Sequence, residues 1–295
     1  MEKTQDIKTF KKPPYLMIAV LFVGAFVAFL NNTLLNVALP TIMVDFGIED
    51  YSTVQWLATG YMLVSGVLVP ASAYLITKFR TRPLFILSMA IFVIGTALAA
   101  FAPSFGLLLT GRMVQAAGAA TMSPILMNVM LISFPVEKRG AAMGIFGLVM
   151  ISAPAIGPTL SGWIVEHYDW SVLFKMILPI AILALLLAVW KLEDVLPNRP
   201  AKIDILSVVL STIGFGGLLY GFSTASSAGW DAFEVWGTIA IGAIGLIWFI
   251  VRQFRLEEPL LDLRIYTYPA YAVASVVSMV LSVAMFSGMI LTPVK

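Results

Sequence analysis

Long apolar runs separated by short polar breaks constrain this chain more than any other feature of its sequence. The runs cover residues 15–36, 54–77, 83–102, 105–134, 140–165, 171–192, 205–222, 235–251 and 270–293. A helix needs about 20 apolar residues to cross a bilayer, and it satisfies its own backbone hydrogen bonds within lipid. The sequence therefore predicts an all-α integral membrane protein with a transmembrane helix at each run.

Composition argues against the soluble alternative, which is one large globular core. Hydrophobic residues make up 60% of the 295 residues, charged residues make up 12%, and the mean hydropathy is +0.96. Soluble domains hold about a quarter charged residues, because they must cover their surface with polar groups. The chain has too few polar residues to do this.

Few groups in the chain are suited to enzyme or metal chemistry. There is no cysteine, and the one histidine, His167, is expected in an outer loop with Glu166 and Asp169. A lone histidine beside solvated acids makes no catalytic constellation. The glycines of residues 205–222 lack the pattern of a phosphate-binding loop. We therefore predict no enzyme activity, no metal site and no cofactor.

The basic residues alternate between the polar breaks. They lie before the first run and after the second, fourth, sixth and eighth runs, and the other breaks contain none. Of the 18 Lys and Arg residues, only Arg112, Lys175 and Lys295 depart from this pattern. Basic loops face the cytoplasm in membrane proteins, which predicts a multi-pass protein with a cytoplasmic N-terminus. The sequence pI of about 8.8 then reflects topology and not a nucleic-acid partner.

Loop lengths divide the chain into two blocks of spans. Residues 1–192 form a six-helix domain with very short loops, and residues 193–204 read as a cytoplasmic linker. Residues 205–251 add two transmembrane helices, and residues 252–269 form a second cytoplasmic linker. We interpret residues 270–295 as the first helix of a second domain that is truncated.

Charged side chains inside the runs are rare. None of the 16 acids lies in the middle of a run, which leaves Arg112 and Lys175 as the charges at membrane depth. A charge at the bilayer centre costs about 2.5–3.5 kcal/mol on insertion scales, so such a residue is a candidate functional group. Arg112 either extends to the headgroups or turns into the bundle beside Gln115, one turn later on the same face. For Lys175 we expect the first arrangement.

Amides are concentrated in the first run, at Asn31, Asn32 and Asn36. Asn32 and Asn36 are four residues apart and share a helix face. An amide in hydrocarbon must find polar partners. Two interpretations remain open: the amides hold helices together, or they line a substrate path.

The fifth run combines small residues with two prolines. Ala153, Gly157 and Ser161 form a stripe at four-residue spacing, which allows close helix packing. Pro154 and Pro158 each remove a backbone hydrogen bond and bend a helix. Close packing requires no proline, so the combination favours a shaped helix at a domain interface.

Three segments together resemble the major facilitator superfamily, and within it the drug:proton antiporters with fourteen spans (EmrB/QacA type). Residues 30–40, LNNTLLNVALP, are similar to that family's L-D-x-T-I-V-N-V-A-L-P signature. Arg112, Gln115 and Gly118 match R-x-x-Q-G-x-G, whose arginine is implicated in proton coupling in the family. Residues 153–162 are similar to the antiporter motif G-P-x-x-G-G, which contains Pro154, Gly157, Pro158, Ser161 and Gly162 here. The resemblance covers the whole chain.

Two departures from the family pattern affect the expected mechanism. The family's acid in the first span is Asn31 here, so any role tied to a carboxylate is lost at that position. The loop after the second span normally reads G-x-L-a-D-r-x-G-R-R, and its acid is Thr77 here. The basic part, Lys78, Arg80 and Arg82, is retained. A lincomycin-resistance-like subgroup with Asn in the first span would fit both changes.

The resemblance implies a proton-coupled multidrug efflux transporter in a bacterial-type plasma membrane, which exports amphiphilic small molecules by alternating access. Asn31, Asn32 and Asn36 would line the cavity, and Arg112 with Gln115 would act in proton coupling. Fourteen spans need more residues than this chain has, so the resemblance implies a C-terminally truncated transporter. The alternatives are a carrier for a natural metabolite or lipid, and a non-transporting membrane fragment.

Overall fold

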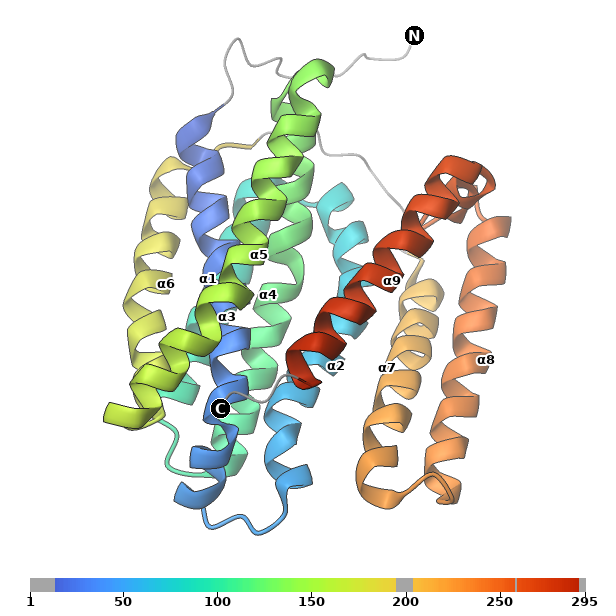
Figure 1. Ribbon diagram of the computed structural model, residues 1–295. Helices are drawn as coiled ribbons and strands as arrows, with labels where there is room; N and C mark the ends of the chain where they lie inside the picture. The colour runs from blue at the N-terminus through green and yellow to red at the C-terminus, as the bar shows by residue number, and fades with distance from the viewer. Residues whose placement is uncertain (1–13, 195–203, 258, 292–295) are drawn as a thin grey trace, which may run out of the picture.

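The computed structural model describes residues 14–194, 204–257 and 259–291 (Figure 1). The helices within these ranges are α1 (Tyr15–Asp45), α2 (Tyr51–Lys78), α3 (Thr81–Ala100), α4 (Phe105–Ser133), α5 (Val136–His167), α6 (Ser171–Lys191), α7 (Ile205–Ala228), α8 (Phe233–Arg255), the 3-10 helix η1 (Leu263–Thr267) and α9 (Pro269–Leu291). The lysines before the first span, most of the 193–204 linker and residues 292–295 lie outside the described residues.

Eight of these helices, α1 to α8, are long and apolar enough to cross a membrane by length and composition. This confirms the predicted all-α integral membrane fold. The helix predicted at residues 270–293 is α9, which begins at Pro269. The first helix is longer than predicted, because α1 continues through Pro40 to Asp45. A proline removes one backbone hydrogen bond, and neighbouring helices in a bundle compensate for that loss.

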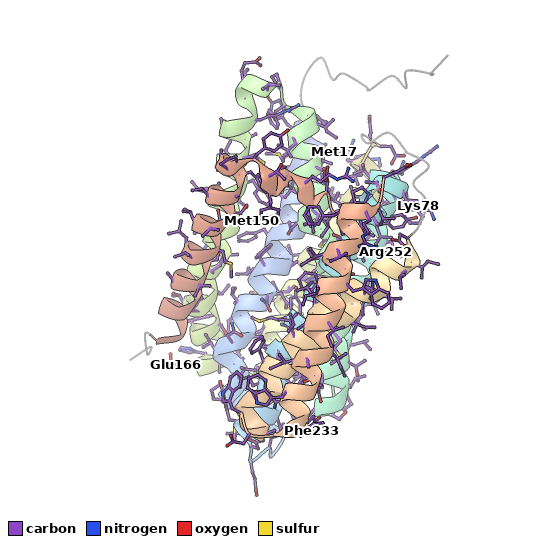
Figure 2. The ribbon with its side chains drawn as sticks, turned by 90° about the vertical axis from the view of Figure 1, so that its right-hand side faces the viewer. Met17, Lys78, Met150, Glu166, Phe233 and Arg252 are labelled. Atoms are coloured by element: carbon purple, nitrogen blue, oxygen red, sulfur yellow. The ribbon has the colours of Figure 1, made fainter. Side chains whose placement is uncertain are left out.

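Short turns reverse the chain between consecutive helices from α1 to α6, and between α7 and α8. The Asp50 carboxylate accepts a hydrogen bond from the Ser52 N–H (2.9 Å) at the start of α2, and Gly47 adopts a φ of 61° in the turn before it. Figure 2 shows Lys78 and Arg252 toward the end of the bundle that holds Met17, with Glu166 and Phe233 toward the opposite end. The structure thus brings these two basic residues to the end at which α1 begins.

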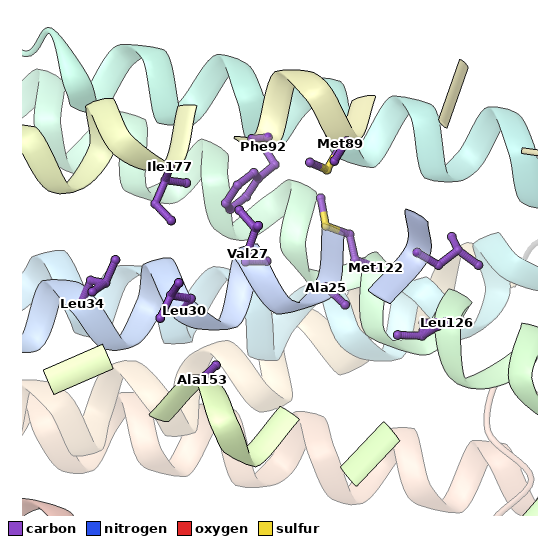
Figure 3. Packing of buried hydrophobic residues seen from close by; sticks show 14 of the residues in the cluster. Ala25, Val27, Leu30, Leu34, Met89, Phe92, Met122, Leu126, Ala153 and Ile177 are labelled. Atoms are coloured by element: carbon purple, nitrogen blue, oxygen red, sulfur yellow. The ribbon is translucent and has the colours of Figure 1, made fainter. Parts of the chain in front are cut away.

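The first helix lies at the centre of the hydrophobic core. It packs against α2, α4, α5 and α6, and most of its residues from Met17 to Ile42 are buried or half-buried. Figure 3 shows Val27 on the side that faces Phe92 of α3, and Ala153 of α5 on the other side of α1. This position brings Asn31 and Asn32 into the interior of the bundle.

Glycines allow α3 and α4 to pack with their backbones close together. A Cβ on Gly118 would lie 2.5 Å from the Ser88 carbonyl oxygen and 2.6 Å from the Phe92 nitrogen. A Cβ on Gly95 would lie 2.5 Å from the Gln115 nitrogen. Real side chains do not approach backbone atoms so closely, so both positions require glycine. The close packing fixes the position of the Arg112–Gln115 segment of α4.

Helix α7 packs against α2 on the outside of the bundle, and α8 packs against α7 (Figure 1). Trp56 of α2 lies 5.7 Å from Tyr220 of α7, measured between ring centroids. The helices α7 and α8 approach each other at Gly217 and Gly242, where a Cβ on Gly242 would lie 2.5 Å from the Leu218 nitrogen. The next helix, α9, packs against η1, and its described side chains are mostly exposed.

An ion pair joins the start of α7 to the end of α8. Arg252 donates from Nε and Nη2 to the two carboxylate oxygens of Asp204, at 2.8 and 2.9 Å. The Gln253 amide donates to the Ser207 hydroxyl (2.9 Å), and its oxygen accepts from the Leu260 N–H (2.7 Å). Two planar hydrogen bonds between a guanidinium and a carboxylate make a strong pair. The hydrogen bonds from Arg252 and from Ser207 lower the pKa of Asp204 to about 2.

Replacing Asp204 by Asn is expected to reduce the free energy of unfolding by about 1 kcal/mol at pH 7, because solvent screens a partly exposed pair. The pKa of Asp204 is lower in the folded protein than in the unfolded chain. Its stabilisation is therefore complete above about pH 4 and is lost as the pH falls toward about 2. Thermal unfolding in detergent should show that the difference between wild type and variant halves by about pH 3. A difference that is the same at pH 7 and pH 3 would contradict this assignment.

Candidate functional site

A buried arginine at the centre of the bundle is the most unusual feature of the interior. Arg112 of α4 is 0% exposed and donates three hydrogen bonds to groups on three helices. Its Nε donates to the Leu57 carbonyl of α2 (3.4 Å), its Nη1 to the Gln115 Oε1 (3.0 Å) and its Nη2 to the Asn32 Oδ1 of α1 (3.1 Å). Of the two arrangements that the sequence left open for Arg112, the structure has the one in which the side chain turns into the bundle. The three hydrogen bonds join α1, α2 and α4.

Uncharged groups surround the guanidinium. The Gln115 Oε1 also accepts from the Asn31 amide (3.2 Å), and the Gln115 amide donates to the Thr96 hydroxyl of α3 (2.9 Å). Gln115 is 0% exposed and Asn31 is 2% exposed. A buried polar network is stable when each member finds a partner, and partial satisfaction is costly. We call Arg112, Gln115, Asn31, Asn32 and Thr96 the arginine network.

An aromatic ring covers the arginine network. The Arg112 Cζ lies 4.3 Å from the centroid of the Tyr61 ring, which is a cation–π contact. Desolvation strengthens such a contact, since the ring replaces water around the cation. Among the described residues, no acidic side chain contacts Arg112. Its positive charge is stabilised by carbonyl and amide oxygens and by the Tyr61 ring.

A mostly apolar cavity of about 540 Å³ lies beside the arginine network. Its wall comes from α1, α2, α4 and α5 and consists of Ala28, Phe29, Asn32, Tyr61, Met62, Ser65, Val69, Ala119, Ala120, Ser123, Pro124, Met127, Asn128 and Phe146. The volume is within the range of sites for drug-sized ligands, which are mostly apolar with a few polar groups. Asn32 and Tyr61 belong to both the wall and the surroundings of Arg112.

The three amides predicted to line a path occupy different environments. Asn32 lines the cavity, whereas Asn31 is buried behind it against Gln115. Asn36 is exposed and is not part of the wall of this cavity. The other membrane cation, Lys175, is also exposed and donates to the Ser171 hydroxyl (3.0 Å), as expected for a side chain that reaches the membrane surface.

The small-residue stripe of α5 faces α1. Ala153, Gly157 and Ser161 are buried, whereas Pro154, Pro158 and Gly162 are half-buried. The Ser161 hydroxyl donates to the Leu34 carbonyl (2.6 Å), and a Cβ on Gly157 would lie 2.3 Å from the Thr33 Oγ1. The helix α5 continues through both prolines. The stripe therefore fixes α5 against the same stretch of α1 that holds the amides.

The predicted basic loop is mostly helical, because Thr77 and Lys78 end α2 and Arg82 lies in the first turn of α3. This segment contacts the end of α6. Arg82 donates from Nη2 to the Val189 carbonyl (2.7 Å), and its N–H donates to the Asp194 carboxylate (3.0 Å). Arg80 lies 4.0 Å from the same carboxylate. Thr77 is exposed, and the Lys78 ammonium lies 5.6 Å from the centroid of the Tyr74 ring. These contacts hold the start of α3 against the end of α6.

Sequence reasoning missed Tyr61, Thr96 and the cavity groups Ser65, Ser123 and Asn128. They are scattered among the apolar residues of α2, α3 and α4, and no motif marks them. Tyr61 and Ser65 are four residues apart, which places them on one face, but only the packing of α2 against α4 shows where that face points. In the described residues, no group of three or more His, Asp or Glu side chains could hold a metal ion.

Comparison with known proteins gives matches over nearly the whole chain. Residues 21–294 match the sequence model of the family described as the Major Facilitator Superfamily. The chain is 45% identical over 283 residues to the MFS-type transporter YhcA of Bacillus subtilis, covering 96% of this chain and 53% of YhcA. It is 43% identical over 280 residues to the lincomycin resistance protein LmrB of the same organism, covering 94% of this chain and 58% of LmrB.

The fold also resembles solved structures. A crystal structure of the peptide transporter POT matches with a TM-score of 0.57 and 17% identity, over 84% of this chain and 54% of that one. This likeness concerns the fold alone. The chain spans about half the length of the curated relatives it matches.

Proposed function

Because the chain belongs to the Major Facilitator Superfamily, we propose that it is the N-terminal portion of a proton-coupled efflux transporter that exports amphiphilic small molecules by alternating access. The type proposed is the drug:proton antiporter with fourteen spans. The names of relatives support the substrate class, since LmrB is a lincomycin resistance protein and a relative that is 30% identical is a multidrug resistance protein B homolog of Mycobacterium tuberculosis.

The single observation that carries the proposal is the apolar cavity joined to a buried arginine through Asn32. Apolar walls bind the body of an amphiphile, and a few fixed polar groups orient it. A charge kept within a membrane helix is costly and marks a transport pathway. Substrate sites of such transporters lie near the membrane midplane between two domains. In the proposal, this cavity is the half of the site that belongs to the first domain.

The packing of the helices supports a division of the chain into three parts. We assign α1–α6 to the first domain, α7 and α8 to the two additional helices, and α9 to the beginning of the second domain. The exposed side chains of α9 support this, because a helix with large uncovered apolar faces needs lipid or further helices around it. The relatives' greater length supports the assignment of the 295 residues to part of a longer transporter.

The proposed location is a bacterial-type plasma membrane, with the N-terminus in the cytoplasm. The clustering of basic residues at the end where α1 begins supports this orientation (Figure 2). The coupled proton needs a titratable group, and the chain has no Asp or Glu between Asp50 and Glu137. Arg112 and Gln115 would therefore act on a proton carrier that lies elsewhere in the complete transporter.

Export of lincomycin tests the proposal. Cells would carry this chain, the reading frame extended to the length of the relatives, or an empty vector, and accumulation of radiolabelled lincomycin would be measured with and without a protonophore. We expect the extended frame alone to lower accumulation, and the protonophore to abolish the difference. Export by the 295-residue chain alone would contradict the proposal that these residues are only part of the transporter. Unchanged accumulation with both chains would favour a carrier for a natural metabolite or a non-transporting protein.

A further inference from the structure

The cavity wall is polar in places, and the described residues that form it carry no formal charge. Five of its side chains can hydrogen bond, namely Asn32, Tyr61, Ser65, Ser123 and Asn128, and the others are apolar. The Asn128 amide donates to the Pro124 carbonyl (3.0 Å), which leaves its oxygen as an acceptor. The Asn32 oxygen accepts from Arg112, which leaves its NH₂ group as a donor. The wall thus offers both donors and acceptors to a ligand.

The charge nearest to this wall is positive and lies behind it. Arg112 is fully buried, and its Nε, Nη1 and Nη2 groups all donate to protein acceptors. It contacts the wall residues Asn32 and Tyr61. Because α2, α3 and α4 contain no Asp or Glu, and α1 has only Asp45 at its end, nothing on these helices neutralises the charge near the cavity.

A cation in the cavity would therefore meet a fixed like charge across a medium of low dielectric constant. Two unit charges attract or repel several times more strongly in a protein interior than in water. The cation would also lose its hydration shell without gaining a carboxylate from this wall. An uncharged amphiphile avoids both costs, and it gains burial of apolar surface and hydrogen bonds to the five polar side chains.

We propose that the wall formed by α1, α2, α4 and α5 makes the transporter selective for uncharged amphiphiles over permanent cations of the same shape. This inference rests on the proposed function and specifies its substrate class. The selectivity comes from weaker binding of the cation, and the uncharged ligand needs no additional contact to be preferred. Arg112 sets the sign of that penalty, and the absence of a carboxylate on the wall leaves it uncompensated.

Two probes of nearly equal shape test the proposal. Triphenylphosphine oxide is uncharged and methyltriphenylphosphonium is a permanent cation, and both present three phenyl rings. Binding of each radiolabelled probe would be measured on the complete transporter in phosphatidylcholine nanodiscs at pH 8, after subtraction of binding to empty nanodiscs. We expect the oxide to bind at least about tenfold more tightly, the size of effect that a like charge nearby produces. Equal affinities, or tighter binding of the phosphonium, would overturn the proposal.

A charge added to the wall provides the matched variant. Ser65→Asp introduces a carboxylate one turn from Tyr61, and it should raise phosphonium affinity at least about tenfold. Ser65→Asn makes a change of similar size without the charge and should give no such gain. Ser123→Asp repeats the test from α4 in case Ser65→Asp does not fold. If neither acidic variant gains affinity for the phosphonium, charge does not decide the selectivity.

Failure of this inference can be told from failure of the proposed function. A transporter that exports lincomycin but binds both probes equally would lack the selectivity and keep the function. A protein that prefers the oxide but exports nothing would keep the selective cavity and lose the proposed function.

Discussion

Replacing Arg112 by Ala in the complete transporter is expected to reduce gradient-driven export of lincomycin by at least about tenfold. The variant removes three donated hydrogen bonds, and a hydrogen bond to a charged group contributes about 1.5–3 kcal/mol. Asn32 then loses the contact that holds it at the cavity wall, and α1, α2 and α4 lose their common partner. The measurement is the initial rate of uptake into everted vesicles with an imposed pH gradient, normalised to the amount of transporter.

Lys175→Ala is the matched control for Arg112→Ala, because it removes the other cation of the membrane segments. Lys175 is exposed and bonded to Ser171, so its loss should leave export nearly unchanged. Arg112→Lys keeps the charge but loses the planar set of donors, and it should recover only part of the rate. Export at the wild-type rate by Arg112→Ala, in normally expressed protein, would refute the role of Arg112.

Replacing Gly118 by Val is expected to lower the free energy of unfolding by about 3 kcal/mol, the upper part of the range for overpacked cores. The new Cβ would lie 2.5 and 2.6 Å from backbone atoms of α3, and backbone cannot move aside as a flexible side chain can. The helices α3 and α4 would separate, and the Gln115–Thr96 hydrogen bond between them would be lost. Thermal unfolding of the purified protein in detergent measures the effect.

Gly106→Val controls for the change in residue type on the same helix. A Cβ on Gly106 meets nothing within 4 Å, so the substitution should change stability by less than about 1 kcal/mol. If the two variants unfold at the same temperature, the close approach of α3 and α4 is not what makes Gly118 necessary.

The sequence was sufficient for the helices, because run length and charge placement are properties of the chain alone. For Arg112 it left two arrangements open, and one of them placed the side chain beside Gln115, since residues three apart lie on one helix face. It could not choose between Asn31 and Asn32 as the partner of Arg112, because that depends on how α1 is rotated against α4. In the structure Arg112 donates a hydrogen bond to Asn32, and Asn31 donates one to Gln115.

Partners on other helices were beyond prediction for the same reason. Thr96 and Tyr61 complete the surroundings of Gln115 and Arg112, but each comes from a helix whose orientation is set by packing. The end of α1 was misjudged by nine residues, from Asn36 to Asp45. An Asn with a proline a few residues later usually marks a helix end, but Asn36 and Pro40 both lie within α1. The roles of Asn36 and of the stripe on α5 in transport stay predictions.

No acidic side chain of the described residues contacts the guanidinium of Arg112, and this has an electrical consequence. A charge inside the bilayer experiences the transmembrane voltage, and displacement across the whole field changes its energy by about 2.3 kcal/mol per 100 mV. Hydrogen bonds to α1, α2 and α4 tie Arg112 to the bundle, so in the proposed alternating-access cycle a rocking bundle would carry charge through part of the field. Translocation of an uncharged solute would then still depend on membrane voltage. Rates measured at imposed potassium diffusion potentials would give the fraction of the field that this single side chain crosses.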